Sequence, residues 1–286
     1  MLRYTEGMSY TPRAKRKYSQ NFFTDADTLA LCVDMMKLRP EDHVLEIGPG
    51  TGILTQLLIE RVNRITAVEI DRDLLELLQL ELGYANGLEL IGADFMRWDL
   101  DSWCAAVPLA QRKLVANIPY HLTSRILEKV LNQTRLRHEN VHPELPLFSD
   151  IFLMVQNEVA QKLVALPGNK DYGVLNITVN LAAEAEVLAI IPREFFQPRP
   201  KVDSAILHLR PRREPLVTIR DPEIFWRLVT RIFQLRRKTL RNVLRALDLP
   251  AETLARAEAR WDLQLRGETL SIRELARLAE LLSPSV

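Results

Sequence analysis

A glycine-rich loop between a short apolar strand and a helix constrains the fold of this 286-residue chain more than any other segment. Residues 43–47 (His-Val-Leu-Glu-Ile) are typical of a buried strand, and residues 53–59 have helical character. Gly48, Gly50 and Gly52 stand between them, and glycine permits a positive φ and close approach of a ligand to the backbone. This order predicts an α/β nucleotide-type site. The Gly-x-Gly-x-Gly spacing differs from the dinucleotide fingerprint, so it disfavours a dehydrogenase without excluding one.

A second predicted strand, residues 64–70, brings an acid to the same edge of the sheet. Glu69 lies about 20 residues past the glycines, the place where a carboxylate reaches ribose hydroxyls. Asp71 is the alternative for that role. Its position also suits the N-cap of a helix over residues 72–78, and capping is the interpretation we favour for it.

Two further predicted strands, residues 88–93 and 113–116, deliver Asp94 and Asn117. Phe95 and Met96 follow Asp94, and an acid with two bulky apolar residues can bond an adenine amine and flank its ring. A simple strand-end turn is the commoner reason for such a sequence. Polar groups at the ends of four successive strands nevertheless predict one shared site, because open α/β sheets bind ligands there.

The tetrapeptide Asn117-Ile118-Pro119-Tyr120 suits methyl transfer to a purine amine. The lone pair of that nitrogen is delocalised into the ring, so it is a poor nucleophile. If the Asn117 side-chain oxygen and the Ile118 carbonyl accept its hydrogens, the nitrogen moves toward tetrahedral geometry and positioning supplies the catalysis. Pro119 stiffens the turn, and Tyr120 offers a stacking surface. Short Asn and Pro clusters are also common in ordinary turns.

Taken together, these motifs resemble those of the S-adenosylmethionine-dependent ribosomal RNA adenine dimethyltransferases, specifically the bacterial KsgA type. The similarity extends to a segment ahead of the glycine loop and to one near the end of the sheet, and it covers residues 15–282. Ser19 and Phe23 stand where the family usually has Gly and Leu, and residues 134–149 look like an inserted surface loop. The matching segments are 18–23, 45–52, 68–71, 92–94, 117–120 and 196–204.

The resemblance implies a Rossmann-like methyltransferase with a central, mostly parallel sheet and a small C-terminal helical domain. The implied reaction is dimethylation of two adjacent adenosines in a hairpin loop near the 3′ end of 16S ribosomal RNA, with S-adenosylhomocysteine as the other product and no metal. It implies that Asn117, Pro119 and Tyr120 act on the target adenine, with Phe196 as the second stacking face and Phe195 left to the core. The implied cofactor contacts are Asn21, Phe23, Gly48, Gly50, Glu69, Asp94 and Asn117.

Composition agrees with a large domain plus a small one, since 47% of the residues are hydrophobic and 26% charged. A further strand is expected at residues 204–210, and Ser271 with Glu274 could form the capping box of a last helix. Cys32 and Cys104 are too few for a disulfide framework, which favours a reducing compartment. The sequence has no apolar run of membrane-spanning length and no apolar signal core near its start, so we expect a cytoplasmic protein.

The net charge is only +1, but basic residues gather in residues 1–20 and 212–245, which favours a nucleic-acid partner. Such runs are often solvated faces. The expected organisation is a basic segment 1–20, a methyltransferase domain 21–211 and a helical domain 216–286 that contacts RNA or the ribosome. Its cationic cluster resembles the signature of the KsgA type and consists of Arg236, Arg237, Lys238 and Arg241.

Three other functions stay open on the sequence alone. A nicotinamide dehydrogenase would share the glycine loop and Glu69 but has no use for residues 117–120. A methyltransferase acting on large-subunit RNA would share the site but generally lacks the cationic cluster. A non-catalytic RNA-binding assembly factor would show eroded motifs, whereas these are intact.

Overall fold

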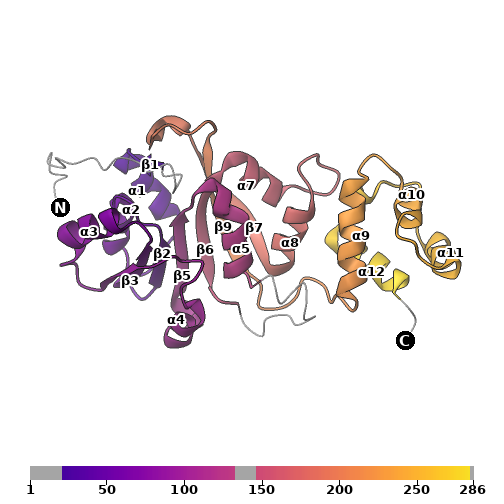
Figure 1. Cartoon of the computed structure of the whole chain (residues 1–286), viewed down its shortest axis with the longest axis horizontal. Coiled ribbons are helices and arrows are strands. Elements are labelled where there is room, and N and C mark those ends of the chain that lie inside the picture. Colours follow the sequence, from indigo (N-terminus) through magenta and orange to yellow (C-terminus); the bar gives the residue numbers. More distant parts are fainter. Residues whose placement is uncertain (1–20, 133–145, 284–286) are drawn as a thin grey trace.

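The computed structural model describes residues 21–132 and 146–283, which contain a seven-stranded sheet in the order β4-β3-β2-β5-β6-β9-β7 (Figure 1). The first five strands in that order pair in parallel, and β9 pairs antiparallel with both β6 and β7. The predicted Rossmann-like α/β class is therefore confirmed. The strands are β1 (Phe22–Phe23), β2 (His43–Ile47), β3 (Arg64–Glu69), β4 (Leu88–Gly92), β5 (Arg112–Asn117), β6 (Asp150–Gln156), β7 (Ala183–Ile191), β8 (Phe196–Gln197) and β9 (Ser204–Pro211).

The strands predicted from the sequence are β2, β3, β4, β5 and β9, each within one residue of its predicted ends. The helices of the described residues include four single-turn 3₁₀ segments: η2 (Leu109–Gln111), η3 (Tyr120–Leu122), η4 (Arg193–Phe195) and η5 (Gly267–Thr269). The α-helices are α1 (Ala26–Met35), α2 (Ile53–Ile59), α3 (Arg72–Leu82), α4 (Leu100–Ala106), α5 (Thr123–Val130), α7 (Asn157–Val164), α8 (Val174–Ala182), α9 (Pro222–Gln234), α10 (Leu240–Arg245), α11 (Ala251–Arg260) and α12 (Ile272–Leu282).

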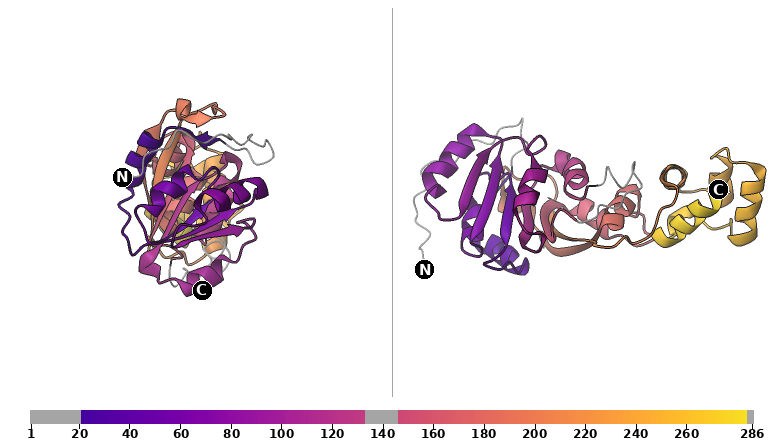
Figure 2. Two further views of the ribbon diagram at one scale, coloured as in Figure 1. Left: turned by 90° about the vertical axis from the view of Figure 1, so that its left-hand side faces the viewer. Right: turned by 90° about the horizontal axis from the view of Figure 1, so that it is seen from below.

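Helices cover both faces of the sheet, and the alternation of side chains along the strands explains why (Figure 2). Val44 and Val115 belong to a core cluster with residues of α1 and α2. Their chain neighbours Leu45 and Leu114 belong to a second cluster with residues of α4, α5 and α7. A parallel sheet buried on both faces needs such near-continuous apolar strands.

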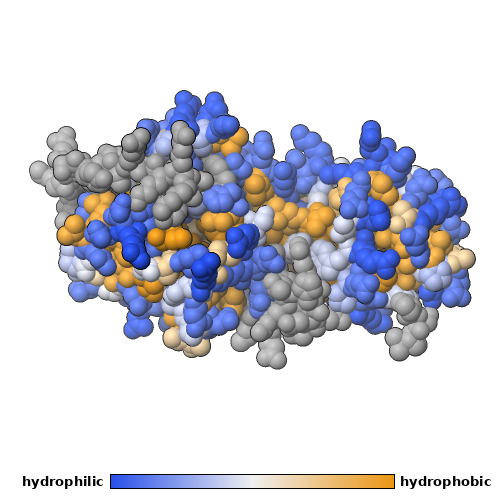
Figure 3. Space-filling view, in the orientation of Figure 1, coloured by the Kyte–Doolittle hydropathy of each residue, from blue (hydrophilic) through white to orange (hydrophobic). Residues whose placement is uncertain are grey.

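Helices α9 to α12 form a separate helical unit at one end of the elongated molecule (Figures 1 and 2). Their core also contains Tyr172, Ile177 and Leu181, from α8 and the loop before it. Figure 3 shows apolar surface across the junction of α8 and α9, in keeping with this shared core. The predicted domain boundaries stay a prediction, since one core takes residues from both sides of them. The capping box predicted at Ser271 and Glu274 is confirmed at the start of α12.

The predicted basic segment 1–20 lies outside the described residues, as do residues 133–145, most of the predicted inserted loop. Across the described part of the chain, every helix is too short or too polar to cross a membrane.

Candidate active site

A pocket opens at the carboxyl ends of β2, β3, β4 and β5. The chain runs from β2 to β3 on one side and later places β5 on the other side of β2, so the pocket lies where the strand order reverses. Ligands of open α/β sheets bind at this position. The pocket is lined by eight of the residues predicted for the site: Asn21, Phe23, Gly48, Gly50, Glu69, Asp94, Asn117 and Pro119.

The glycine loop after β2 forms one wall of the pocket. Gly48 and Gly50 have φ angles of 66° and 63°, in the left-handed region that side chains disfavour. The amide of Gly50 donates a hydrogen bond of 3.1 Å to Glu69 Oε2 at the end of β3. The loop backbone is therefore held against the neighbouring strand, with no side chain at Gly48 or Gly50 to block a ligand.

Glu69 is 4% exposed and organises the pocket floor. Its Oε1 accepts a 2.8 Å hydrogen bond from the amide of Asp71, and its Oε2 accepts the bond from Gly50. Burial raises the pKa of Glu69, and these backbone donors oppose that rise. Asp71 accepts from the amide of Asp73 at 3.2 Å and caps α3, as predicted, so Glu69 is the better candidate for a ribose contact.

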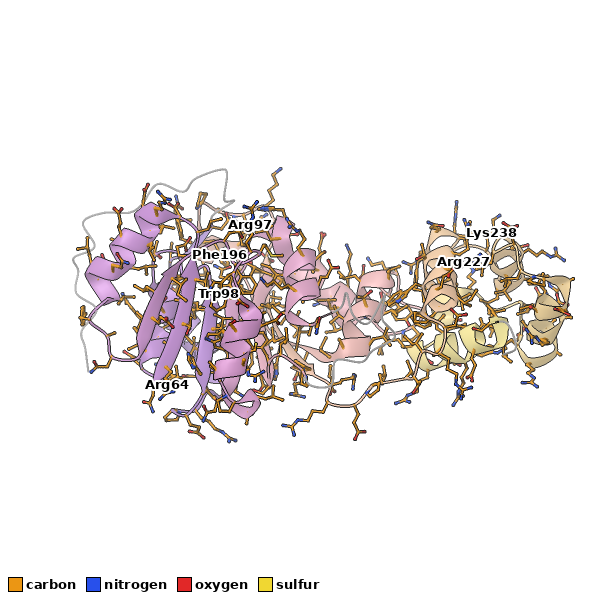
Figure 4. The ribbon with its side chains drawn as sticks, turned by 60° about the horizontal axis from the view of Figure 1, so that its bottom comes forward. Arg64, Arg97, Trp98, Phe196, Arg227 and Lys238 are labelled. Carbon is orange, nitrogen blue, oxygen red and sulfur yellow. The ribbon has the colours of Figure 1, made fainter. Side chains whose placement is uncertain are left out.

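The loop after β4 forms the opposite wall. Asp94 Oδ1 accepts a 2.9 Å hydrogen bond from the amide of Met96, and the Asp94 side chain is 40% exposed. Its Oδ2 lies 3.8 Å from Arg97 Nε, a distant pair whose arginine side chain is 90% exposed at the surface (Figure 4). Phe95 and Met96 line the pocket beside Asp94. A carboxylate and two apolar side chains thus occur together, as an adenine site requires.

Asn117 stands at the end of β5 and reaches the same pocket. Its Nδ2 donates to the backbone oxygen of Asn21 at 3.4 Å. That orientation leaves Oδ1 as the acceptor that the carboxamide offers. Pro119 also lines the pocket, and the side chain of Tyr120 lies outside the described part of the structure.

The burial of the two phenylalanines is the reverse of what the sequence predicted, and the stacking role of Phe196 stays a prediction. Phe196, labelled in Figure 4, is 2% exposed. It packs edge-on against Phe23, with ring centroids 4.9 Å apart. Phe195 is the partly exposed ring of the two. The reason is the antiparallel pairing of β1 with β8, which sets Phe23 opposite Phe196 and draws the latter into the core.

The guanidinium of Arg236 bonds groups within the protein, and its predicted RNA contact stays a prediction. It donates to Glu268 at 2.6 Å and to the carbonyls of Lys170 and Asn169 at 2.8 and 3.1 Å, and it lies 5.6 Å from the centre of the Phe233 ring. These bonds tie the helical unit to the loop between α7 and α8.

The other members of the cationic cluster differ in their surroundings. Arg241 pairs with Glu258 at 2.8 Å and is only partly exposed. Arg237 and Lys238 are exposed, and Lys238 projects from the helical unit in Figure 4.

The sequence reasoning missed Glu46, which lines the pocket from within β2. It is 1% exposed, and its Oε2 accepts a 2.8 Å hydrogen bond from Thr55. Its Oε1 is buried and lacks a hydrogen-bond partner among the described residues. Burial raises its pKa to about 8. An acid inside an apolar strand was the available signal, since such a group stays buried only when something bonds it.

Replacing Glu46 with glutamine is expected to stabilise the ligand-free protein increasingly as pH rises. In the unfolded chain this carboxyl has the ordinary glutamate pKa of 4.5, whereas in the folded protein it stays protonated up to about 8, so folding takes up a proton between these values. Stability is therefore lost as pH rises through that window, by up to about 1.4 kcal/mol per pH unit, and glutamine removes the loss. Urea unfolding of both proteins from about pH 5 to about pH 8 measures the difference. If the difference in the free energy of unfolding between the two proteins stayed constant with pH, the raised pKa of Glu46 would be contradicted.

The fold and the pocket define a class: a Rossmann-like methyltransferase that uses S-adenosylmethionine. The ribosomal RNA adenine dimethylase family model matches residues 11–283. A protein of Listeria monocytogenes named "Ribosomal RNA small subunit methyltransferase A" is 37% identical, over 94% of this chain and 90% of the relative. One of the same name from Lactococcus lactis is 38% identical, with the same shares covered. The chain belongs to the ribosomal RNA adenine dimethylase family.

Two solved structures are similar along almost their whole length. A dimethyladenosine transferase from Plasmodium falciparum has 25% identity and a TM-score of 0.74, with 90% of this chain and 95% of the other covered. The 23S rRNA methyltransferase ErmE has 29% identity and a TM-score of 0.65, with 91% and 99% covered. The chain is thus a ribosomal RNA adenine methyltransferase. Residues 21–132 and 146–283 contain no group of three or more His, Cys, Asp or Glu side chains placed to hold a metal ion.

Proposed function

We propose that this chain dimethylates two adjacent adenosines in a hairpin loop near the 3′ end of 16S ribosomal RNA, within the small subunit or its precursor in the cytoplasm. The curated relatives named as small-subunit methyltransferases support the choice of RNA. The observation that carries the chemistry is the carboxamide of Asn117, held by Asn21 with its oxygen as the acceptor in the pocket that Glu69 and Asp94 share.

The residues of the pocket fit S-adenosylmethionine, which supplies an electrophilic methyl group on a sulfonium. Glu69 would accept hydrogen bonds from the ribose hydroxyls. Asp94 Oδ2 would accept a hydrogen bond from the adenine amine, and the apolar side chains of Phe95 and Met96 would lie beside the ring. Glu46 Oε1 has no hydrogen-bond partner in the protein, and it would accept a hydrogen bond from the ammonium group of the methionine moiety. Asn21, Phe23, Gly48 and Gly50 complete the lining, with Gly48 and Gly50 contributing backbone alone.

The target adenine would meet residues 117–120. Asn117 Oδ1 and the Ile118 carbonyl would accept the two amine hydrogens and direct the nitrogen lone pair toward the methyl group. Pro119 would keep the Ile118 carbonyl aimed outward, and Tyr120 would stack on the base. The adenine amine is itself the nucleophile: its nitrogen bonds the methyl carbon as the bond from that carbon to sulfur breaks, S-adenosylhomocysteine leaves, and the nitrogen gives up one proton to water. The site therefore needs no nucleophilic side chain.

A labelled-methyl assay tests the choice of RNA. Unmethylated small subunits should accept label from S-adenosylmethionine, and the product should be dimethyladenosine at two neighbouring positions. Isolated large-subunit RNA should accept little, and the similarity to ErmE makes it the comparison that matters. Preferred labelling of the large-subunit RNA would overturn the proposal.

Subunit binding measured at several salt concentrations, together with the labelled-methyl assay, tests the proposed RNA contacts of the helical unit. Replacing Arg237 and Lys238 with glutamine should weaken subunit binding. The slope of log K against log salt concentration should become shallower by roughly one to two, because fewer phosphate contacts release fewer counterions. Turnover at saturating subunit should survive. The control is Arg273→Gln with Arg277→Gln, two arginines of α12 outside the cationic cluster. Equal effects of the two pairs would count against a specific contact.

A further inference from the structure

Lys129 is a partly buried amine on α5 that none of the proposed roles uses. Its Nζ donates to the carbonyl oxygens of Phe95 at 2.7 Å and Trp98 at 2.9 Å. It also lies 4.9 Å from the centre of the Phe95 ring, within the range of a cation–π contact. One side chain of α5 therefore holds the backbone of the loop after β4 at two points.

That loop is a single tight turn. The amides of Arg97 and Trp98 both donate to the carbonyl of Asp94 at 2.9 Å, while Asp94 Oδ1 caps the amide of Met96. The carbonyl of Trp98, at the far end of the turn, also accepts a 3.0 Å hydrogen bond from the amide of Leu100. A cation at the carbonyl end of such a turn adds further hydrogen bonds and complements the local dipole. Lys129 is in that place. Burial lowers its pKa, and Asp101, Asp94 and Asp99 oppose the fall.

The turn presents the cofactor-facing side chains, so its shape decides where they stand. Asp94, Phe95 and Met96 line the pocket. Lys129 bonds the backbone carbonyls of the same turn. Without the ammonium, the carbonyl of Phe95 would need another donor, and the carbonyl of Trp98 would keep only its 3.0 Å hydrogen bond from the amide of Leu100. The turn could then rotate so that water bonds these carbonyls.

We propose that Lys129 is a positioning residue that sets the affinity and the base selectivity for the adenine of S-adenosylmethionine by fixing the turn of residues 94–98. This inference rests on the proposed contact between Asp94 and the adenine amine. Lys129 acts through the turn and touches neither the cofactor nor the RNA.

The test compares Lys129→Met, which keeps the length of the side chain and removes the amine, with the wild-type protein. The dissociation constant for S-adenosylhomocysteine, measured by calorimetry, should rise about tenfold, as for loss of a charged hydrogen bond. The preference for S-adenosylhomocysteine over S-inosylhomocysteine, which lacks the exocyclic amine, should shrink. Lys129→Arg should restore part of the preference. Lys162→Met, at a lysine of α7 away from the pocket, should change neither value.

A second measurement separates this role from a general loss of stability. Combined with Asp94→Ala, Lys129→Met should add little further loss of affinity, because the group that it positions is gone. Full additivity, or an unchanged base preference in Lys129→Met, would overturn the inference. Unchanged cofactor affinity with a lower salt slope of RNA binding would overturn it as well and would mark a phosphate contact. If the wild-type protein itself shows no base preference, the proposed contact between Asp94 and the adenine amine is wrong, and the inference about Lys129 falls with it.

Discussion

Replacing Asn117 with alanine is expected to lower the rate of methyl transfer by roughly a hundredfold or more, while RNA binding changes little. The carboxamide oxygen is proposed to act on the reacting amine, and loss of one such transition-state hydrogen bond typically costs that much. Single-turnover methylation at saturating RNA and cofactor measures the rate, and filter binding measures the RNA affinity. Near-normal turnover would remove Asn117 from the mechanism.

Two variants sharpen that test. Asn117→Asp keeps an acceptor oxygen and should lose less activity than Asn117→Ala, although it loses the Nδ2 donor to Asn21. Asn157→Ala is the matched control, since Asn157 is a half-buried asparagine that does not line the pocket. It should methylate at the wild-type rate.

Glu69→Ala is expected to raise the dissociation constant for S-adenosylmethionine by about tenfold to a hundredfold, which corresponds to roughly 1.5–3 kcal/mol for charged hydrogen bonds. The variant removes the proposed ribose acceptor and also releases the amides of Gly50 and Asp71 that the carboxylate holds. Calorimetric titration measures the constant. Glu69→Gln keeps one acceptor oxygen, so its dissociation constant should lie between those of the wild-type protein and Glu69→Ala.

Asp71→Ala provides the comparison. Asp71 caps α3, so its loss should lower the free energy of unfolding by about 1 kcal/mol with a much smaller effect on cofactor affinity. If Glu69→Ala binds the cofactor normally and Asp71→Ala does not, the ribose contact belongs to Asp71.

Local sequence patterns were enough to predict five strands of the sheet and several of the residues that line the pocket. The strand at residues 43–47, the glycine loop and the polar groups at 69, 94 and 117 depend on neighbours in the chain and on one rule of sheet geometry. Parallel strands bring their carboxyl ends to one edge, so the residues that follow them meet wherever those strands are adjacent. The capping roles of Asp71 and Ser271 were predictable for the same reason, since a cap acts within its own first turn.

Only the tertiary structure decided what the remaining side chains do. Phe196 is buried because β1 comes from the start of the described chain to pair with β8, and Arg236 is engaged because a loop about 66 residues earlier offers it carbonyls. The hydrogen bonds of Lys129 to the turn after β4 likewise join residues more than 30 positions apart. The missing partner of Glu46 Oε1 also became visible only in the folded pocket. The sequence by itself determined which strands form and which polar groups follow them, because these are local or periodic properties. Burial and the choice of partner are set by long-range packing, and no spacing along the chain encodes them.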